Sequence, residues 1–467
     1  LSYGRKLAEF LGQDRAPISV GRVMTCVLGM VVSRELEIRN FVKTPFYRVL
    51  STIQLGEKSF EGEWKSVKGS HYFESFDLYK ENGFKKKEKA EELIAYLSEI
   101  QPLQCTVASV EKKIEKKAPP LLYNLAELQN ECSKRFKISP DETLKIVQEL
   151  YEKKLVTYPR TDARVLSTAV AKEISKNLNG LAKYDMAKPY LQDILQFGTH
   201  KGLEKTKYVN DKQITDHYAI IPTGQGISAL SSVSGTAQKV YETIVRRFLS
   251  IFYPPAEYQK VSLILQVNKE QFFANFKILV KEGYLKVVGN SFDKKKTDED
   301  EMKCDEQFME VLKTLRKGSK LPLTKTEIKE GETSPPKRYN SGSIILAMEN
   351  AGQLIEDEEL RAQIKGSGIG TSATRAEILK KLINNKYIAL NKKTQILTPM
   401  LLGEMIFDVV NVSISSLLRA DLTASWEKGL DMVAKKEIMP DEFMGKHSRN
   451  VRGSPCFGVL SCRKQKN

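Results

Sequence analysis

The chain has 467 residues, and its 74 Lys plus Arg exceed its 58 Asp plus Glu, which gives a formal net charge of +16. Such a basic surface favours polyanionic partners, although ribosome-associated and membrane-surface proteins share it. The 41% hydrophobic content and the lack of a long uncharged apolar run predict a soluble chain of about three domains. Six scattered cysteines without a signal peptide argue against a secreted disulfide framework and favour a reducing cytosol.

The first residues predict two helical stretches with a turn between them. Residues 1–14 have helical spacing, and a turn over residues 15–25 leads into the apolar run 27–32. We expect Ser19 to cap the second stretch at its start, and we expect Gly21 to permit the close approach of neighbouring groups there. The chain begins at Leu1 in an apparent helix without Met, so we expect it to be a fragment.

The sequence then changes to alternating apolar and polar residues, which predicts strands. Residues 47–54, 69–78 and 103–110 follow this pattern, and a basic amphipathic helix is expected over residues 85–97. Residues 111–120 carry four lysines and end in two prolines, a composition typical of a linker.

A mostly helical domain is predicted after this segment. Ser139, Pro140 and Glu142 form a capping box with proline at the first helical position. Further helices are expected over residues 169–177 and 237–252.

Residues 258–288 return to strand alternation, so the helical domain is predicted to interrupt one sheet domain. The acid-rich residues 298–301 lie among lysines and indicate a solvated loop rather than a metal site. Residues 341–352 predict a short helix, and a glycine loop at 364–371 enters another helix. A hairpin expected over 387–397 would complete a winged-helix-like unit, which suits DNA.

Tyr158 and Arg160, in the stretch Thr157-Tyr158-Pro159-Arg160-Thr161-Asp162, could attack a phosphodiester. A tyrosine hydroxyl is a weak nucleophile and needs cationic or hydrogen-bonding neighbours, and a guanidinium grips phosphate oxygens in pairs. Taken alone, the stretch is equally typical of a helix that ends in a proline turn with an ordinary half-buried tyrosine.

Three other stretches gain meaning beside it: residues 19–23, 216–223 and 368–375. Each is weak by itself, because a lone histidine such as His217 is more often structural than catalytic. The glycine loop could be a tight turn or a phosphate cradle at a helix N-terminus.

In this order and spacing, the four stretches resemble the type IA DNA topoisomerases, most closely the bacterial topoisomerase III branch. The resemblance covers almost all of residues 1–440. It implies a multidomain α+β torus with helical, winged-helix-like domains and a β-rich arch. The expected parts are a DNA-binding base (1–40 and 335–440), the arch (41–115 and 253–330), the helical domain with the nucleophile (120–252) and a basic, disordered tail (441–467).

The resemblance also implies roles for individual residues. Tyr158 would form a 5′-phosphotyrosine, Arg160 would hold the scissile phosphate and His217 would donate or steer a proton. The supporting residues would be Thr157, Thr161, Asp162 and Asp216, with Asp216 orienting His217. The expected DNA contacts are Ser19, Val20, Gly21, Arg22, Val23, Met24, Thr371, Ser372 and Arg375.

Departures from the family pattern concern the metal and fine DNA contacts. Met24 stands where glutamine is usual, and Cys26 where proline is usual. Family members begin with a Toprim domain whose carboxylates bind Mg²⁺, and nothing before residue 19 supplies it. We therefore expect no metal ligands in this chain and weak or no activity from it alone.

The predicted function is ATP-independent relaxation of negative supercoils and decatenation through single-strand cleavage, strand passage and religation. One alternative is a catalytically incomplete fragment that binds single-stranded DNA. A tyrosine recombinase or nickase fits poorly, since the histidines form no His-x-His pair and Ile220 replaces the arginine that a recombinase needs after His217. We expect a cytoplasmic, nucleoid-associated monomer that is assisted by a helicase or single-strand-binding protein and does not bind membranes.

Overall fold

The computed structural model describes Arg5 and residues 19–99, 102–214, 216–289, 301–303, 305–354 and 368–445. The chain divides into two compact units, the first from residues 1–40, 121–248 and 336–467 and the second from residues 41–120 and 249–335. These divisions lie close to the boundaries expected from the sequence. The expected base and helical domains, however, fall within one unit. The predictions for residues 1–14, 298–300 and the tail after residue 445 lie outside the described residues.

The second unit is built on one large sheet, to which both of its separate chain segments contribute strands. Its strands are β1 (Pro45–Leu55), β2 (Lys58–Lys65), β3 (Leu78–Lys80), β4 (Gly83–Phe84), β5 (Gln104–Lys117), β6 (Ala256–Val267), β7 (Glu270–Lys281), β8 (Glu301–Lys303) and β9 (Lys320–Glu332). The order is β2-β7-β6-β5-β9-β1-β4-β3, with β8 beside β7. Because β2 also pairs with β1, the strands β2, β7, β6, β5, β9 and β1 close into a ring.

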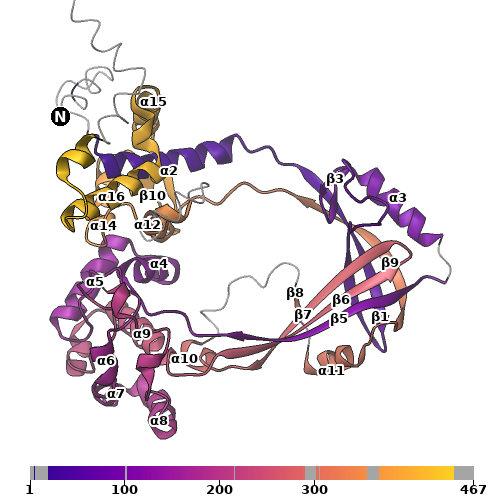
Figure 1. Cartoon of the computed structure of the whole chain (residues 1–467), viewed down its shortest axis with the longest axis horizontal. Coiled ribbons are helices and arrows are strands. Elements are labelled where there is room, and N and C mark those ends of the chain that lie inside the picture. Colours follow the sequence, from indigo (N-terminus) through magenta and orange to yellow (C-terminus); the bar gives the residue numbers. More distant parts are fainter. Residues whose placement is uncertain are drawn as a thin grey trace, which may run out of the picture. The chain divides into compact units, whose positions relative to one another are not determined.

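Strand alternation explains how this ring encloses a core. Buried and partly buried residues alternate along β6 from Val261 onward and along the first part of β7, as expected for strands with one covered face. Val261, Leu265 and Phe272 from these strands join Trp64 and Ile53 in one buried cluster. The helices of this unit are α3 (Lys87–Ser98), α10 (Leu285–Val288) and α11 (Glu306–Thr314), and Figure 1 shows β5, β6 and β7 running side by side.

Two sequence predictions in this unit are wrong. Residues 69–78 are mostly turns, and β3 begins at Leu78. The lysine-rich stretch expected as a linker is instead the second half of β5, which pairs with β6 as far as Lys117. Glu115 Oε2 lies 2.8 Å from Lys260 Nζ on β6 and 3.2 Å from Lys277 Nζ on β7. These ion pairs between strands offset part of the charge of this stretch.

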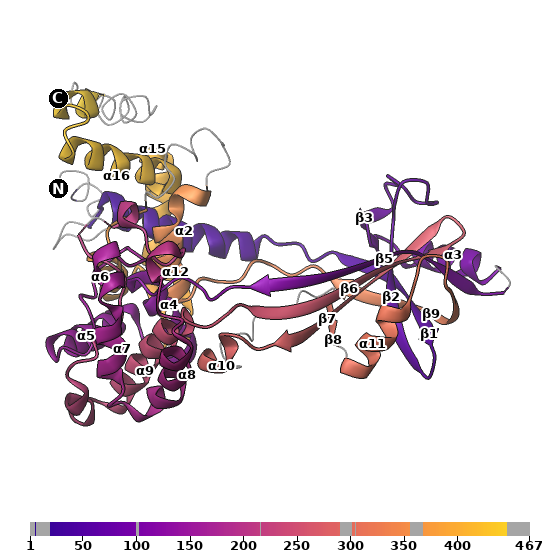
Figure 2. The ribbon, with the colours of Figure 1, turned by 60° about the horizontal axis from the view of Figure 1, so that its bottom comes forward.

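The first unit is mainly helical. Its α-helices are α2 (Arg22–Arg39), α4 (Leu125–Phe136), α5 (Pro140–Glu152), α6 (Thr168–Lys172), α7 (Ile174–Leu181), α8 (Lys188–Phe197), α9 (Gly235–Ser250), α12 (Ser341–Glu349), α14 (Arg375–Asn384), α15 (Leu401–Ile414) and α16 (Ala420–Ala434). Short 3₁₀ turns lie at η1 (Asp185–Ala187), η2 (Leu203–Lys205), η3 (Asp211–Gln213), η4 (Ile227–Ser232), η5 (Ala351–Leu354) and η6 (Ser415–Leu418). Figure 2 shows α5 to α9 gathered together in this unit.

Local sequence explains the helices that precede the nucleophile candidate. The Asn124 side chain caps α4 by accepting from Glu127 N, and the Ser139 hydroxyl caps α5 by accepting from Glu142 N. Pro140 is at the first position of α5, as predicted. The helix α4 packs against α12, and Ala126 of α4 joins the core formed with α2, α12, α14 and α15.

The C-terminal part contains the predicted hairpin, with β10 (Ile388–Leu390) paired to β11 (Leu397–Pro399) after α14. The second strand lies slightly later in the chain than expected. One segment of the described residues, Leu401–Leu418, is long and apolar enough to cross a membrane by length and composition. It consists of α15 and η6, and Ile406, Phe407 and Val410 of α15 are buried in the core of the unit. Over the whole segment, 22% is buried within the structure.

Candidate active site

Tyr158 lies in an extended segment that follows the end of α5. Lys154 adopts the left-handed conformation with φ of 61°, and Leu155 N then donates to Leu150 O at 2.9 Å, so the chain turns sharply away from the helix. Val156 next pairs with Pro222 in an antiparallel bridge, and Thr157 N donates to Ile221 O at 3.0 Å. The segment before Tyr158 is therefore held against residues 219–222.

Two threonines flank Tyr158 and fix the backbone of the 217–221 segment. The Thr157 hydroxyl donates to Ala219 O and accepts from Ile221 N, each at 3.0 Å. The buried Thr161 hydroxyl donates to His217 O at 2.8 Å. These bonds bring the predicted supporting threonines and His217 together around Tyr158.

The rings of Tyr158 and His217 lie 4.3 Å apart between centroids, with an interplanar angle of 44°. Tyr158 is half-buried and His217 is exposed. Tyr151, at the end of α5, also contacts the ring of Tyr158 in an edge-to-face arrangement, with centroids 5.4 Å apart. A protonatable ring therefore lies beside the phenol, within reach of groups that react at the Tyr158 oxygen.

Arg160 and Asp216 are exposed near this centre. Over the described ranges, the guanidinium of Arg160 forms neither a hydrogen bond nor an ion pair, which leaves its donors available for a phosphate. Asp216 is likewise not hydrogen-bonded to His217 in the described part of the chain, so the structure does not bring these two side chains together as predicted.

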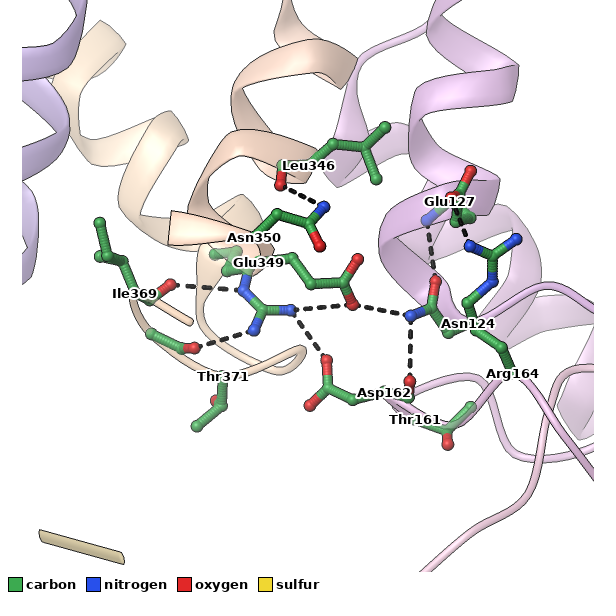
Figure 3. A network of polar contacts seen from close by, with 12 residues as sticks. Asn124, Glu127, Thr161, Asp162, Arg164, Leu346, Glu349, Asn350, Ile369 and Thr371 are labelled. Atoms are coloured by element: carbon green, nitrogen blue, oxygen red, sulfur yellow. Dashed lines mark hydrogen bonds and ion pairs between the residues drawn. The ribbon is translucent and has the colours of Figure 1, made fainter. Parts of the chain in front are cut away.

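Asp162, two residues after Arg160, links the Tyr158 loop to the glycine loop. Its carboxylate lies 2.8 Å from Arg375 Nη1, and Arg375 also donates to Ile369 O and Gly370 O at 3.3 and 3.1 Å. Figure 3 shows the Asp162 carboxylate joined to this network. Arg375 is 4% exposed, so its guanidinium is committed to protein groups. These contacts hold the two loops together, and the expected contact of Arg375 with DNA phosphates stays a prediction.

Glu349, at the end of α12, and Asn124, the cap of α4, complete the network. Asn124 Nδ2 donates to Glu349 Oε1 at 2.7 Å and to Asp162 O at 3.0 Å, and Glu349 Oε1 lies 3.8 Å from Arg375 Nη1 (Figure 3). Sequence reasoning missed both residues. Asn124 carried a usable signal, because an Asn before a helical apolar pattern is a cap candidate, whereas nothing local distinguishes Glu349.

Burial raises the pKa of Glu349 to about 7, because removal from water disfavours the charged carboxylate. Arg375 opposes this rise, Asp162 and Glu127 increase it by repulsion, and the bond from Asn124 opposes it. The carboxyl that joins α12 to the Tyr158 loop can therefore change charge near neutral pH.

The predicted DNA contacts at residues 19–24 lie at the start of α2. Gly21 is the N-cap residue and has no side-chain cap, so Ser19 does not fill the expected capping role. Arg22 forms an ion pair with Glu427 of α16, while Val20, Val23 and Met24 pack against the core of the unit. Ser19 and Gly21 remain exposed.

Thr371 and Ser372 lie between Gly370 and α14. Thr371 is exposed, and its backbone N donates to Thr374 Oγ1 at 3.0 Å. Ser372 is half-buried. The described hydrogen bonds and ion pairs connect the glycine loop to the Tyr158 loop through Arg375 and Asp162, and they connect residues 19–24 to neither loop. Among the described residues, no group of three or more His, Cys, Asp or Glu is arranged to hold a metal ion.

Comparisons with known proteins fit this geometry. A family model described as DNA topoisomerase matches residues 1–445. The chain is 33% identical over 434 residues to DNA topoisomerase 3 of Bacillus subtilis and 32% identical to that of Bacillus licheniformis, in each case over 92% of this chain and 55% of the relative. The chain therefore spans about half the length of these relatives.

A solved structure shows the same fold. Full-length topoisomerase I from Thermotoga maritima superposes with a TM-score of 0.63 over 94% of this chain and 64% of that protein, at 23% sequence identity. The multidomain α+β architecture expected from the sequence is thereby confirmed.

Proposed function

Because this chain belongs to the DNA topoisomerase family, we propose that it cleaves one DNA strand through Tyr158, permits strand passage and reseals the break without ATP. The observation that carries this proposal is the position of the Tyr158 phenol beside the His217 ring, 4.3 Å between centroids, with the exposed Arg160 two residues away. The reaction would relax negative supercoils and separate linked DNA circles.

The chemistry is a pair of transesterifications. The Tyr158 oxygen loses its proton and bonds to phosphorus, the bond from phosphorus to the 3′ oxygen breaks, and that oxygen takes up a proton. The product is a 5′-phosphotyrosine and a free 3′ hydroxyl, so the reverse reaction needs no external energy source. His217 is the group that donates or steers a proton, and Arg160 offsets the charge on the phosphate oxygens.

Mg²⁺ is the cofactor expected from the resemblance, and the carboxyl groups of Asp162 and Glu349 do not fit it. Asp162 is paired with Arg375, and Glu349 is buried with a raised pKa, whereas a magnesium site favours ionised, accessible oxygen ligands. We therefore assign no step of the reaction on these residues to a metal ion.

Single-stranded DNA is the proposed substrate. The net charge of +16 supports a polyanion, and contacts with phosphates rather than base edges would suit an enzyme that acts on many sequences. We further propose a cytoplasmic, nucleoid-associated monomer that a helicase or single-strand-binding protein assists. The names of the relatives favour this function over the alternative of DNA binding without chemistry, and they do not support a tyrosine recombinase or nickase.

The test is covalent capture of single-stranded DNA labelled at its 3′ end, because the strand 3′ to the break would become attached to the protein. The chain should retain the label after denaturation. The Tyr158→Phe variant should not, because it lacks the reacting oxygen although its packing is nearly unchanged. The Tyr79→Phe variant removes a phenol of the other unit and should behave like the wild type. Adduct formation by Tyr158→Phe would refute the role of Tyr158 as nucleophile, whereas absence of an adduct from the wild type would favour the alternative of a catalytically incomplete fragment that binds single-stranded DNA.

A further inference from the structure

A cavity of about 480 Å³ opens beside Tyr158. Aromatic rings from two segments form much of its wall: Tyr151 and Tyr158 come from the end of α5 and the segment after it, and His217 and Tyr218 come from the segment that Thr157 and Thr161 hold. Lys154 and Gln225 add polar groups. The proposed chemistry uses Tyr158 and His217 and gives no role to the rest of this wall.

The aromatic residues of the cavity wall differ in their exposure to solvent. Tyr218 is half-buried, and burial raises the pKa of its phenol, which is consistent with an apolar surrounding. Tyr151 is 39% exposed, and its ring stands at 81° to that of Tyr158. A planar group that entered the cavity would therefore meet aromatic surface on more than one side.

The covalent chemistry limits which part of the DNA can lie here. When the Tyr158 oxygen is bonded to a 5′ phosphate, the nucleoside on that phosphate is joined to the tyrosine by a single phosphodiester. Its base is then the aromatic part of the DNA nearest to the cavity wall. Bases stack on aromatic side chains with little dependence on sequence, because every base has a flat π face.

We infer that this cavity receives the base of the nucleotide whose 5′ phosphate Tyr158 captures, with Tyr151 as a stacking wall. The inference rests on the proposed function, since that reaction places this nucleotide beside Tyr158. Stacking would hold the cleaved end in place while the tyrosine bond lasts and would keep the 5′ phosphate in position for resealing. It would act on purines and pyrimidines alike.

The experiment uses the full chain and single-stranded oligonucleotides that already carry a 5′ phosphate, so binding is measured without cleavage. One oligonucleotide has a normal first nucleotide and the other has an abasic first nucleotide. The abasic change should weaken binding to the wild type about tenfold, the size expected for the loss of one stacked base. The same change should have less than about a twofold effect on the Tyr151→Leu variant, which keeps apolar volume but lacks the ring.

Two variants serve as matched controls. Tyr151→Phe keeps the ring and should retain the wild-type response to the abasic change. Phe197→Leu removes an exposed ring, 72% exposed at the end of α8 and outside the cavity wall, and should also retain it. As a direct readout, 2-aminopurine at the first nucleotide should lose fluorescence on binding to the wild type and to Tyr151→Phe, but not to Tyr151→Leu. The same probe at an interior nucleotide reports on stacking elsewhere.

Equal responses of wild type and Tyr151→Leu to the abasic change would overturn the inference, as would quenching that Tyr151→Leu leaves intact. Failure of the topoisomerase proposal gives a different pattern: no covalent adduct on an uninterrupted strand, whatever the behaviour of 5′-phosphorylated ends. A chain that binds neither oligonucleotide would contradict both proposals.

Discussion

The carboxyl of Glu349 makes the stability of the helical unit depend on pH near neutrality. Its pKa in the folded protein rises from 4.5 to about 7, chiefly because burial disfavours the charged form. The rise corresponds to about 3 kcal/mol, since one pKa unit corresponds to about 1.4 kcal/mol. Because the folded protein holds this proton more tightly than the unfolded chain, the contribution is fully present below about pH 4.5 and is lost as the pH rises through about 7.

The Glu349→Gln variant tests this reasoning because glutamine has the shape of the protonated acid and cannot ionise. Relative to the wild type, the variant should gain free energy of unfolding as the pH rises from about 5 to about 8, by up to about 3 kcal/mol. The variant also loses the ion pair with Arg375, 3.8 Å away, which contributes to the same difference in free energy of unfolding. The slope of the difference against pH is therefore the decisive quantity.

The two tryptophans allow each unit to be followed separately. Trp426 lies in α16 of the first unit, and Trp64 lies in β2 of the second. With 5-fluorotryptophan labelling, two ¹⁹F resonances should report urea unfolding of the two units, and Glu349→Gln should alter the pH dependence of the Trp426 signal alone. A difference that stays flat from pH 5 to 8, or falls, would refute the reasoning.

A carboxyl with the opposite shift supplies the control. Arg419 helps to hold the pKa of Asp421 below its ordinary value of 3.8, against the effect of burial. Its contribution to stability is present above about pH 3.8 and is lost as the pH falls through its lower folded value. The Asp421→Asn variant should therefore run parallel to the wild type between pH 5 and 8, whatever its constant offset.

Further expectations concern cleavage and binding. Arg160→Ala should lower adduct formation about a hundredfold and change single-strand affinity much less, and equal losses would make Arg160 an anchor for DNA. Thr157→Val should lower the free energy of unfolding in urea by about 1–3 kcal/mol and reduce adduct formation, because Ala219 O and Ile221 N lose their hydrogen bonds to the hydroxyl. Thr157→Ser keeps the hydroxyl and should preserve both stability and adduct formation. A Thr157→Val variant with wild-type stability and adduct formation would contradict this role. Single-strand affinity should fall at least about tenfold between about 50 and 200 mM salt, and an affinity that ignores salt would refute the electrostatic argument.

Local signals predicted the elements whose stability is itself local. The helix α5 begins where Ser139 and Pro140 indicate, because cap and first turn lie within a few residues of each other. Beyond Val110 the sequence of β5 predicts a linker, because its lysines are typical of a solvated segment, whereas the structure has a strand there. Its pairing with β6 involves residues about 150 positions later, and no short window contains that information.

The same division applies to the site. The resemblance identified Tyr158, Arg160 and His217 by motif, and the structure brings the first and third together. Glu349 escaped detection because Asn124 is 225 residues away in the chain, so its role depends wholly on tertiary packing. Arg375 carries a motif position that suits a phosphate, yet burial assigns its donors to Asp162 and to loop carbonyls.

The polar contacts around the nucleophile leave a specific pair of side chains uncommitted. Thr157 and Thr161 fix the backbone on either side of Tyr158, and Asp162 ties the following turn to Arg375. Within the described residues, neither the Tyr158 hydroxyl nor the Arg160 guanidinium has a hydrogen-bond partner. Binding of a phosphate to this phenol and guanidinium costs little free energy, because no internal hydrogen bond must break first. The backbone that carries them is already held in place, so little conformational entropy is lost. The rigid threonine contacts and the free side chains are therefore two parts of one preorganised arrangement.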